Sequence, residues 1–208
     1  MKGLDESQVI TMKKVITISR EFGSGGRTIG KEVAKKLGYE YYDKEIIEKI
    51  ASESGLSKSF IEENAEHAPG TNIFSYAFVG RNENGESISD YLWKAQCKVI
   101  NDIAEKGNCV IVGRCADYIL LDRIDCLHVF VHADMEKRID RIINLYGETN
   151  EKPEKRIIKK DKKRKANYKY YTDRTWGMSQ NYHITLDSGV IGIDKCVDVI
   201  CNLAKDLK

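Results

Sequence analysis

Short hydrophobic runs alternate with amphipathic helical stretches along most of this chain. Apolar residues recur at helical spacing between the runs, and glycines often end these helical stretches. Strands that alternate with helices are typical of a parallel sheet covered by helices on both faces, with ligands bound at the carboxyl ends of the strands. The pattern predicts an α/β fold with a five-stranded parallel sheet. The predicted strands are 15–19, 39–42, 108–113, 126–132 and 182–187, and the predicted helices are 27–37, 44–54, 57–65, 89–106, 134–146, 152–171 and 193–207, with an irregular loop at 69–86.

The composition favours one globular domain over residues 1–208, because 208 residues with 41% hydrophobic content suffice for one sizeable core. We expect residues 1–13 to form a flexible polar leader, since they lack the apolar centre of a signal peptide, and no stretch has the length and apolarity of a transmembrane span. The six cysteines form no C-x-x-C pair, which predicts reduced thiols in a cytoplasmic protein. The four histidines, His67, His128, His132 and His183, lack metal-ligand spacing, which favours structural roles.

A glycine-rich turn follows the first predicted strand and leads directly into the first predicted helix. Such a turn lets the backbone curl around an anion, while the helix directs its free amides and the positive end of its dipole at it. Arg27 and Thr28 stand where a cation and a hydroxyl can meet phosphate and Mg²⁺. The turn therefore predicts a phosphate-binding loop, made of Gly23, Ser24, Gly25, Gly26, Arg27 and Thr28.

Two patterns of phosphate loop compete here, beside a plain strand-to-helix turn. The dinucleotide pattern G-x-G-x-x-G fits Gly23 and Gly25 but finds Thr28 in place of its third glycine, although Asp43 lies near the expected ribose-binding distance. The P-loop pattern G-x-x-x-x-G-K-[ST] also fits in part. It places Arg27 at the lysine and Glu21 at the first glycine. The local pattern favours a P-loop and leaves the other two interpretations open.

Cations are concentrated in one segment after residue 151, although the formal net charge of the chain is only +2. Three interpretations are open: a solvated helix face, a mobile basic lid over polyphosphate, or a nucleic-acid contact. Aromatic residues follow in the same segment, and we expect them to pack it against the core rather than to stack on a base. These aromatic residues are Tyr168, Tyr170, Tyr171 and Trp176.

Three stretches together resemble the cytidylate kinase-like family. They are residues 16–27 followed by 41–43, residues 110–120, and residues 129–133 followed by Glu136, Arg138 and Arg141. The resemblance covers about residues 15–203. It implies a P-loop nucleoside monophosphate kinase fold with a helical acceptor-binding insert at about 43–90 and a basic lid at about 148–178, and it favours the P-loop interpretation.

The resemblance also implies roles for individual residues. The loop of residues 23–28 would bind the β and γ phosphates of ATP, with Thr28 facing Mg²⁺. An ungapped alignment of the following helix places Gly26, rather than Arg27, opposite the kinase lysine, so the lysine is absent in either register. Arg114 matches the arginine that contacts the acceptor phosphate, while Cys115 stands where the family has an acidic residue.

Further site residues follow from the resemblance and from charge. Asp43 is expected to orient the acceptor or Mg²⁺-bound water, unless it only caps a helix. The strongest lid candidates are Arg164 and Arg174, because an arginine fork grips phosphate with defined geometry, and Lys160 and Lys163 come next.

We therefore expect an enzyme that transfers a phosphoryl group from Mg-ATP to a nucleoside monophosphate, CMP or a related nucleotide, without a membrane partner. One alternative is a nucleotide-binding regulatory P-loop protein with weak or no turnover, as the missing lysine suggests. A kinase of another small-molecule acceptor is a second, and a nucleic-acid-binding module built on the basic segment is a third.

Overall fold

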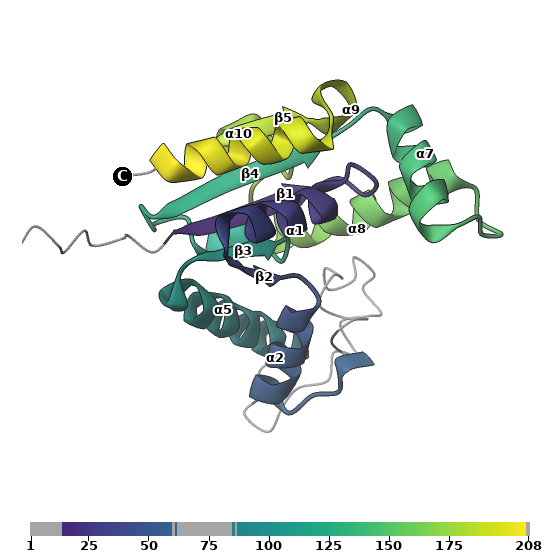
Figure 1. Ribbon diagram of the computed structural model, residues 1–208. Coiled ribbons are helices and arrows are strands. Elements are labelled where there is room, and N and C mark those ends of the chain that lie inside the picture. Colours follow the sequence, from purple (N-terminus) through teal and green to yellow (C-terminus); the bar gives the residue numbers. More distant parts are fainter. Residues whose placement is uncertain (1–13, 60, 62–84, 86, 207–208) are drawn as a thin grey trace, which may run out of the picture.

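A central parallel sheet lies between two layers of helices (Figure 1). The computed structural model describes residues 14–59, 61, 85 and 87–206. The strands follow the order β2-β3-β1-β4-β5, all parallel, so β1 is central. The predicted five-stranded α/β fold is thereby confirmed. The strands are β1 (Val15–Arg20), β2 (Glu40–Tyr42), β3 (Cys109–Val112), β4 (Cys126–His132) and β5 (Ile184–Asp187).

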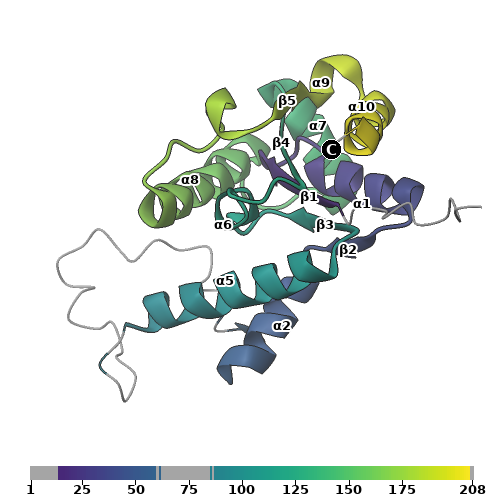
Figure 2. The same cartoon turned by 90° about the vertical axis from the view of Figure 1, so that its left-hand side faces the viewer.

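Alternate residues of each strand face opposite helical layers, as the two-residue period of a strand requires. Helices α1 (Gly26–Leu37) and α10 (Ile193–Asp206) cover one face of the sheet, and α2 (Glu45–Ser54) and α5 (Ile88–Lys106) cover the other (Figures 1 and 2). Ile16, Ile18 and Val129 belong to the core under α1 and α10, whereas Val15 and Ile111 belong to the core under α2 and α5. Both faces of the central strand are therefore buried; one is apolar, and the other carries the hydroxyls of Thr17 and Ser19 beside Val15. The helices are α1 (Gly26–Leu37), α2 (Glu45–Ser54), α5 (Ile88–Lys106), α6 (Ala116–Ile119), α7 (Met135–Tyr146), α8 (Pro153–Thr172), α9 (Ser188–Ile191) and α10 (Ile193–Asp206), with a short 3₁₀ turn η1 (Ser179–Asn181).

Local signals in the sequence set the ends of these helices. Gly38 takes the left-handed conformation after α1, where its N–H donates to the carbonyl of Ala34. Asp134 caps α7 by accepting a hydrogen bond from the Lys137 N–H. The predicted elements in the described regions match within two residues. The leader 1–13, the loop 69–86 and most of the helix expected at 57–65 lie outside the described residues.

All six cysteines are free thiols, as the sequence predicts, and Cys97 alone among them is not fully buried. Within the described ranges, no helix is long and apolar enough to cross a membrane.

A histidine pair lies where β4 meets the segment before β5. The His128 side chain is 1% exposed, and its Nδ1 lies 2.8 Å from the Thr17 hydroxyl. The His183 ring stacks on it, and His183 Nδ1 accepts a hydrogen bond from the His128 backbone N–H. Burial and the neighbouring His183 lower the pKa of His128 to about 4. The structure therefore favours the neutral ring.

We predict that the free energy of unfolding falls as the pH drops from about 6.5 towards 4. The unfolded His128 binds a proton below about pH 6.5, whereas the folded one binds it only near pH 4, so the loss reaches at most about 3 kcal/mol. Urea unfolding across this range should show a flatter pH dependence for His128→Asn than for the wild type. Equal slopes in His128→Asn and the wild type would contradict the assignment.

Candidate active site

A cationic cleft of about 340 Å³ opens at the carboxyl ends of β1, β2 and β3, beside α7 and α8. Seven lysine and arginine side chains line it, against two carboxylates. Such an excess of positive charge in one concave site suits a ligand that carries several negative charges. The cationic cleft is lined by Arg20, Glu21, Phe22, Gly23, Gly25, Gly26, Arg27, Thr28, Asp43, Lys44, Ile47, Arg114, Arg141, Leu145, Tyr146, Lys160 and Arg164.

The loop between β1 and α1 curls tightly at one wall of the cleft. Gly23 and Gly25 have φ values of +86° and +82°, a conformation that favours glycine. A side chain at either position would also meet a neighbour, since a Cβ on Gly23 would lie 2.9 Å from the Arg138 carbonyl oxygen. Ser24 points inward instead of lining the cleft: its hydroxyl lies 3.0 Å from the Glu21 carbonyl oxygen and 3.1 Å from that of Val131.

Helix α1 begins directly after this loop, so the N–H groups of its first turn have no partner inside the helix. Gly26, Arg27 and Thr28 form that turn and all line the cleft. Backbone amides and the positive end of the helix dipole therefore add to the side-chain charge, which is the arrangement that binds phosphate at helix N-termini.

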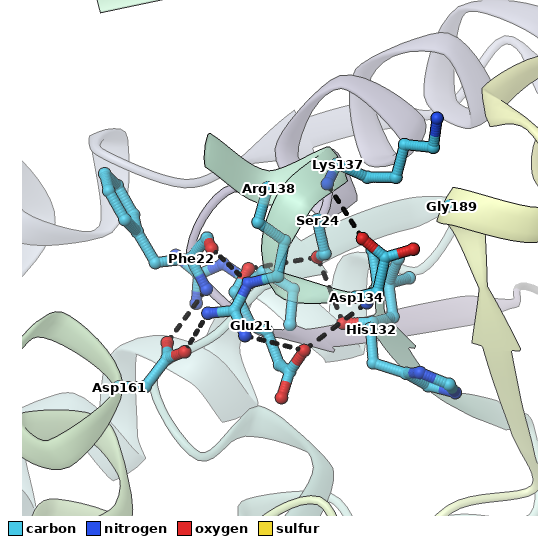
Figure 3. Close-up of polar contacts among 12 residues, drawn as sticks. Glu21, Phe22, Ser24, His132, Asp134, Lys137, Arg138, Asp161 and Gly189 are labelled. Atoms are coloured by element: carbon cyan, nitrogen blue, oxygen red, sulfur yellow. Dashed lines mark hydrogen bonds and ion pairs between the residues drawn. The ribbon is translucent and has the colours of Figure 1, made fainter. Parts of the chain in front are cut away.

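Four residues hold the start of the loop from behind, and we call them the loop clamp: Glu21, Phe22, Arg138 and Asp161 (Figure 3). Arg138 of α7 is 5% exposed; its Nε donates to the Phe22 carbonyl at 2.8 Å and its Nη1 to Glu21 Oε2 at 3.1 Å. Its Nη2 pairs with Asp161 of α8, whose other oxygen accepts from the Phe22 N–H at 2.8 Å. The loop clamp thus fixes both backbone groups of Phe22 and joins two helices to the loop.

Asp43, which follows β2, pairs with two arginines that line the cleft. Arg27 pairs with it through Nε and Nη2, and Arg20 Nη2 lies 3.7 Å from its Oδ1. Burial lowers the pKa of Arg27, but the charge of Asp43 and its hydrogen bonds outweigh burial and raise it. Arg27 is therefore a permanent cation on the rim of the cleft.

Arg114 follows β3 in a left-handed backbone conformation, with φ +60°, and Cys115 continues it with φ +53°. Non-glycine residues in this conformation cost on the order of 1 kcal/mol each, and such strain clusters at functional sites. Gln96 of α5 stabilises the turn by donating to the Arg114 carbonyl at 3.0 Å. The turn directs Arg114 into the cleft.

Asp117 lies behind the cleft, in the core between β1 and α8. It accepts hydrogen bonds from the hydroxyls of Ser19, at 3.0 Å, and Tyr168, at 2.7 Å. Burial raises its pKa despite these bonds, and burial likewise raises the pKa of the Cys115 thiol. Cys115 is therefore neutral and does not replace the acidic residue of the resembled family. Asp117 instead fastens α8 to the central strand.

Most of the residues singled out in the sequence come together in the cleft; Ser24, Lys163 and Arg174 do not line it. The Arg174 guanidinium lies 5.5 Å from the centre of the Tyr118 ring. The expected aromatic packing is confirmed for Tyr168, which is buried, and for Tyr171, which stacks on Trp93 at 4.3 Å. It is confirmed also for Trp176, whose ring meets Phe130 edge to face, whereas Tyr170 is exposed.

Sequence reasoning missed Arg20, Lys44 and Asp161 as parts of this site. Asp161 carries a signal in retrospect, because it is the single acidic residue within the lysine-rich stretch 159–165. A carboxylate among so many cations favours a buried ion pair. Arg20 has a weaker signal: a charged residue that ends an otherwise uncharged strand.

The oxygen donors of the cleft could supply only part of the coordination of Mg²⁺, with phosphate oxygens and water supplying the rest. Among the described residues, no group of three or more histidine, cysteine, aspartate or glutamate side chains is placed to hold a metal. Mg²⁺ usually keeps several waters and takes one or two protein oxygens beside phosphate oxygens. The Thr28 hydroxyl and the Asp43 carboxylate line the cleft and suit that partial role.

Comparison with known proteins gives one family and several solved folds. The profile of the cytidylate kinase-like family matches residues 15–190. A protein from Eubacterium ventriosum, described as uncharacterized, has 25% identity and a TM-score of 0.70, over 93% of this chain and 99% of that one. The shikimate kinase of Acinetobacter baumannii, solved with shikimate, has 17% identity and a TM-score of 0.53, over 95% and 96%. A gluconokinase from Sinorhizobium meliloti has 14% identity and a TM-score of 0.51, over 94% of this chain and 95% of that one.

These two kinases share the fold of this chain, which is the P-loop kinase fold. A search of curated protein sequences gives no match.

We predict that Asp161→Ala lowers the free energy of unfolding by about 2–4 kcal/mol, because it removes one of the two carboxylates that pair with the buried Arg138 and leaves the Phe22 N–H unbonded. Urea unfolding measures the change. The control is Glu151→Ala, which removes an exposed ion pair between Glu151, just before α8, and Lys159 of α8. It should lower the free energy of unfolding by less than about 1 kcal/mol. Equal, small losses in both variants would show that the loop clamp does not stabilise the fold.

Proposed function

The chain belongs to the cytidylate kinase-like family, and from this membership and the geometry of the cleft we propose that it transfers the terminal phosphoryl group of Mg-ATP to the phosphate of a nucleoside monophosphate, CMP or a related nucleotide. The observation that carries the proposal is the convergence of cations from separate elements on one cleft. Arg27 comes from the loop, Arg114 from the end of β3, and Lys160 and Arg164 from α8. Two phosphate groups brought end to end need such neutralisation.

The loop of residues 23–28 supports the donor site. Its curled backbone and the first turn of α1 offer N–H groups to the β and γ phosphates, as in other helix-terminal phosphate sites. The Thr28 hydroxyl and the Asp43 carboxylate would hold Mg²⁺ bound with ATP, and the ion would neutralise charge on the phosphates. In this proposal residues 43–90 form the acceptor-binding insert and residues 148–178 the lid.

The transfer itself needs no nucleophilic side chain. An oxygen of the acceptor phosphate attacks the γ phosphorus in line, the bond from phosphorus to the β-γ bridging oxygen breaks, and ADP leaves. The chain's own groups position the reactants and stabilise negative charge as it moves to the leaving oxygen. Arg114 holds the acceptor phosphate, while Lys160 and Arg164 approach from α8 and exclude water.

Two other functions have specific support. The absence of a lysine at either expected loop position favours a nucleotide-binding regulatory protein with little turnover. The fold shared with shikimate kinase and gluconokinase favours a kinase of another small acceptor. The excess of cations beside Arg114 supports a phosphorylated acceptor over a neutral one.

A phosphoryl-transfer screen with Mg-ATP tests the proposal against nucleoside monophosphates, the matching nucleosides, shikimate and gluconate. We expect CMP or a related nucleotide to be converted to its diphosphate and the nucleosides to be ignored. Arg114→Ala should cut this turnover at least tenfold while ATP affinity changes less than threefold, since the lost contact belongs to the acceptor. Phosphorylation of a neutral acceptor that survives Arg114→Ala would replace the proposal.

Arg27→Ala should weaken Mg-ATP binding about tenfold to hundredfold, because one charge-assisted phosphate contact contributes about 1.5–3 kcal/mol. Isothermal titration measures the affinity. Lys35→Ala, at an exposed position later in α1, serves as the control and should bind as the wild type does. If Arg27→Ala also binds unchanged while remaining folded, Arg27 is not a donor contact.

A further inference from the structure

The backbone conformation at Gly26 does not require a glycine. It is the first residue of α1, and its φ lies outside the left-handed range that makes other loop glycines necessary. In the ungapped register it stands opposite the lysine of the kinase loop, which reaches the β and γ phosphates in P-loop proteins. Something other than backbone conformation must therefore account for a missing side chain at this position.

The side chain of Arg20 fills that space. A Cβ built on Gly26 would lie 2.5 Å from Arg20 Cβ and 2.9 Å from Arg20 Cγ, closer than real atoms approach. A second glycine lies at the other end of the same side chain: a Cβ on Gly113 would overlap Arg20 Nη1. Two glycines from separate turns thus form one slot, and Arg20 lies along it from stem to guanidinium.

The slot leads the guanidinium into the cationic cleft. The Arg20 side chain is 11% exposed and lines the cleft, and its Nη2 lies 3.7 Å from Asp43. Its backbone carbonyl accepts a hydrogen bond from Arg164 Nη1 at 3.0 Å, which fixes the point where the side chain starts. By contrast, the Arg27 side chain is 45% exposed.

We propose that Arg20 supplies the cation that the P-loop lysine supplies elsewhere, and that its guanidinium binds the terminal phosphate of a nucleoside triphosphate. The proposal rests on the proposed function and names a further phosphate-binding residue for it. The slot lies between the first turn of α1 and the turn that carries Arg114, and therefore between the donor and acceptor sites. A guanidinium there offers a bidentate fork to the phosphoryl oxygens, and Asp43 is its carboxylate partner.

The test moves the cation from one side of the slot to the other. Arg20→Gly should weaken Mg-ATP binding about tenfold to hundredfold and leave the affinity for AMP, which has no terminal phosphates, within threefold of wild type. The double variant Arg20→Gly with Gly26→Lys should regain most of the lost affinity, because the vacated slot now admits a lysine. Gly26→Ala alone should weaken Mg-ATP binding, because its Cβ displaces Arg20. In the Arg20→Gly background it should cost nothing more.

Circular dichroism and thermal melting check that each variant folds, and Arg20→Lys adds a variant that keeps a cation in the slot and should bind Mg-ATP better than Arg20→Gly. Lys31→Ala, exposed on α1, is the matched loss of one positive charge and should bind as the wild type does.

Unchanged Mg-ATP affinity in Arg20→Gly overturns the proposal. Equal losses for AMP and ATP, or a double variant no better than Arg20→Gly, also overturn it, because Arg20 would then only support the loop. A wild type that binds no Mg-ATP refutes the proposed function before any variant is compared.

Discussion

The ion pair between Arg138 and Asp161 is the interaction on which the site depends most. It is buried, it joins α7 to α8, and the same two side chains bond to both backbone groups of Phe22. A phosphate loop offers backbone amides, which bind only when the peptide planes are held in the correct directions. Here a rigid charged pair behind the loop holds them, so the position of the basic helix and the shape of the loop are set together. Removal of either partner would leave a buried charge, which explains why a lysine-rich helix carries an aspartate at this point.

Asp43 in the cleft and Asp161 behind it hold arginine side chains in place. Asp43 contacts two arginines and Asp161 two more, so the protein's own carboxylates position these guanidinium groups. Phosphate oxygens present the same fork geometry as a carboxylate. In the proposed function, a ligand phosphate would exchange with Asp43 in the cleft, whereas Asp161 lies behind the loop and would keep its partners. The two carboxylates are equally buried, with about a tenth of each side chain exposed, and they differ in position: Asp43 lines the cleft and Asp161 does not.

Much of the fold could be predicted from the sequence because local signals decide it. A few neighbouring residues suffice to identify the β-branched runs such as 109–112, the glycine that ends α1 and the glycine turn before α1. The site was harder to predict, because contacts between distant residues decide which cations face the cleft. Arg174 has the same charge as Arg164, yet it lies against Tyr118. Neither Asp161 nor Arg20 could be assigned from neighbours in the chain, since their partners lie up to 144 positions away or across two separate turns.

The shared volume of Arg20 and Gly26 also constrains how this loop can change during evolution. A lysine cannot appear at position 26 while arginine occupies position 20, because the two side chains would claim the same space. Losing the arginine first leaves the cleft without that cation until a second substitution arrives. If Arg20 binds phosphate as proposed, the two positions are epistatic, because each single substitution towards a lysine-bearing loop lowers the affinity for phosphate. We expect arginine at position 20 to occur together with glycine at position 26, and glycine at position 20 together with lysine at position 26. The mixed combinations should be rare.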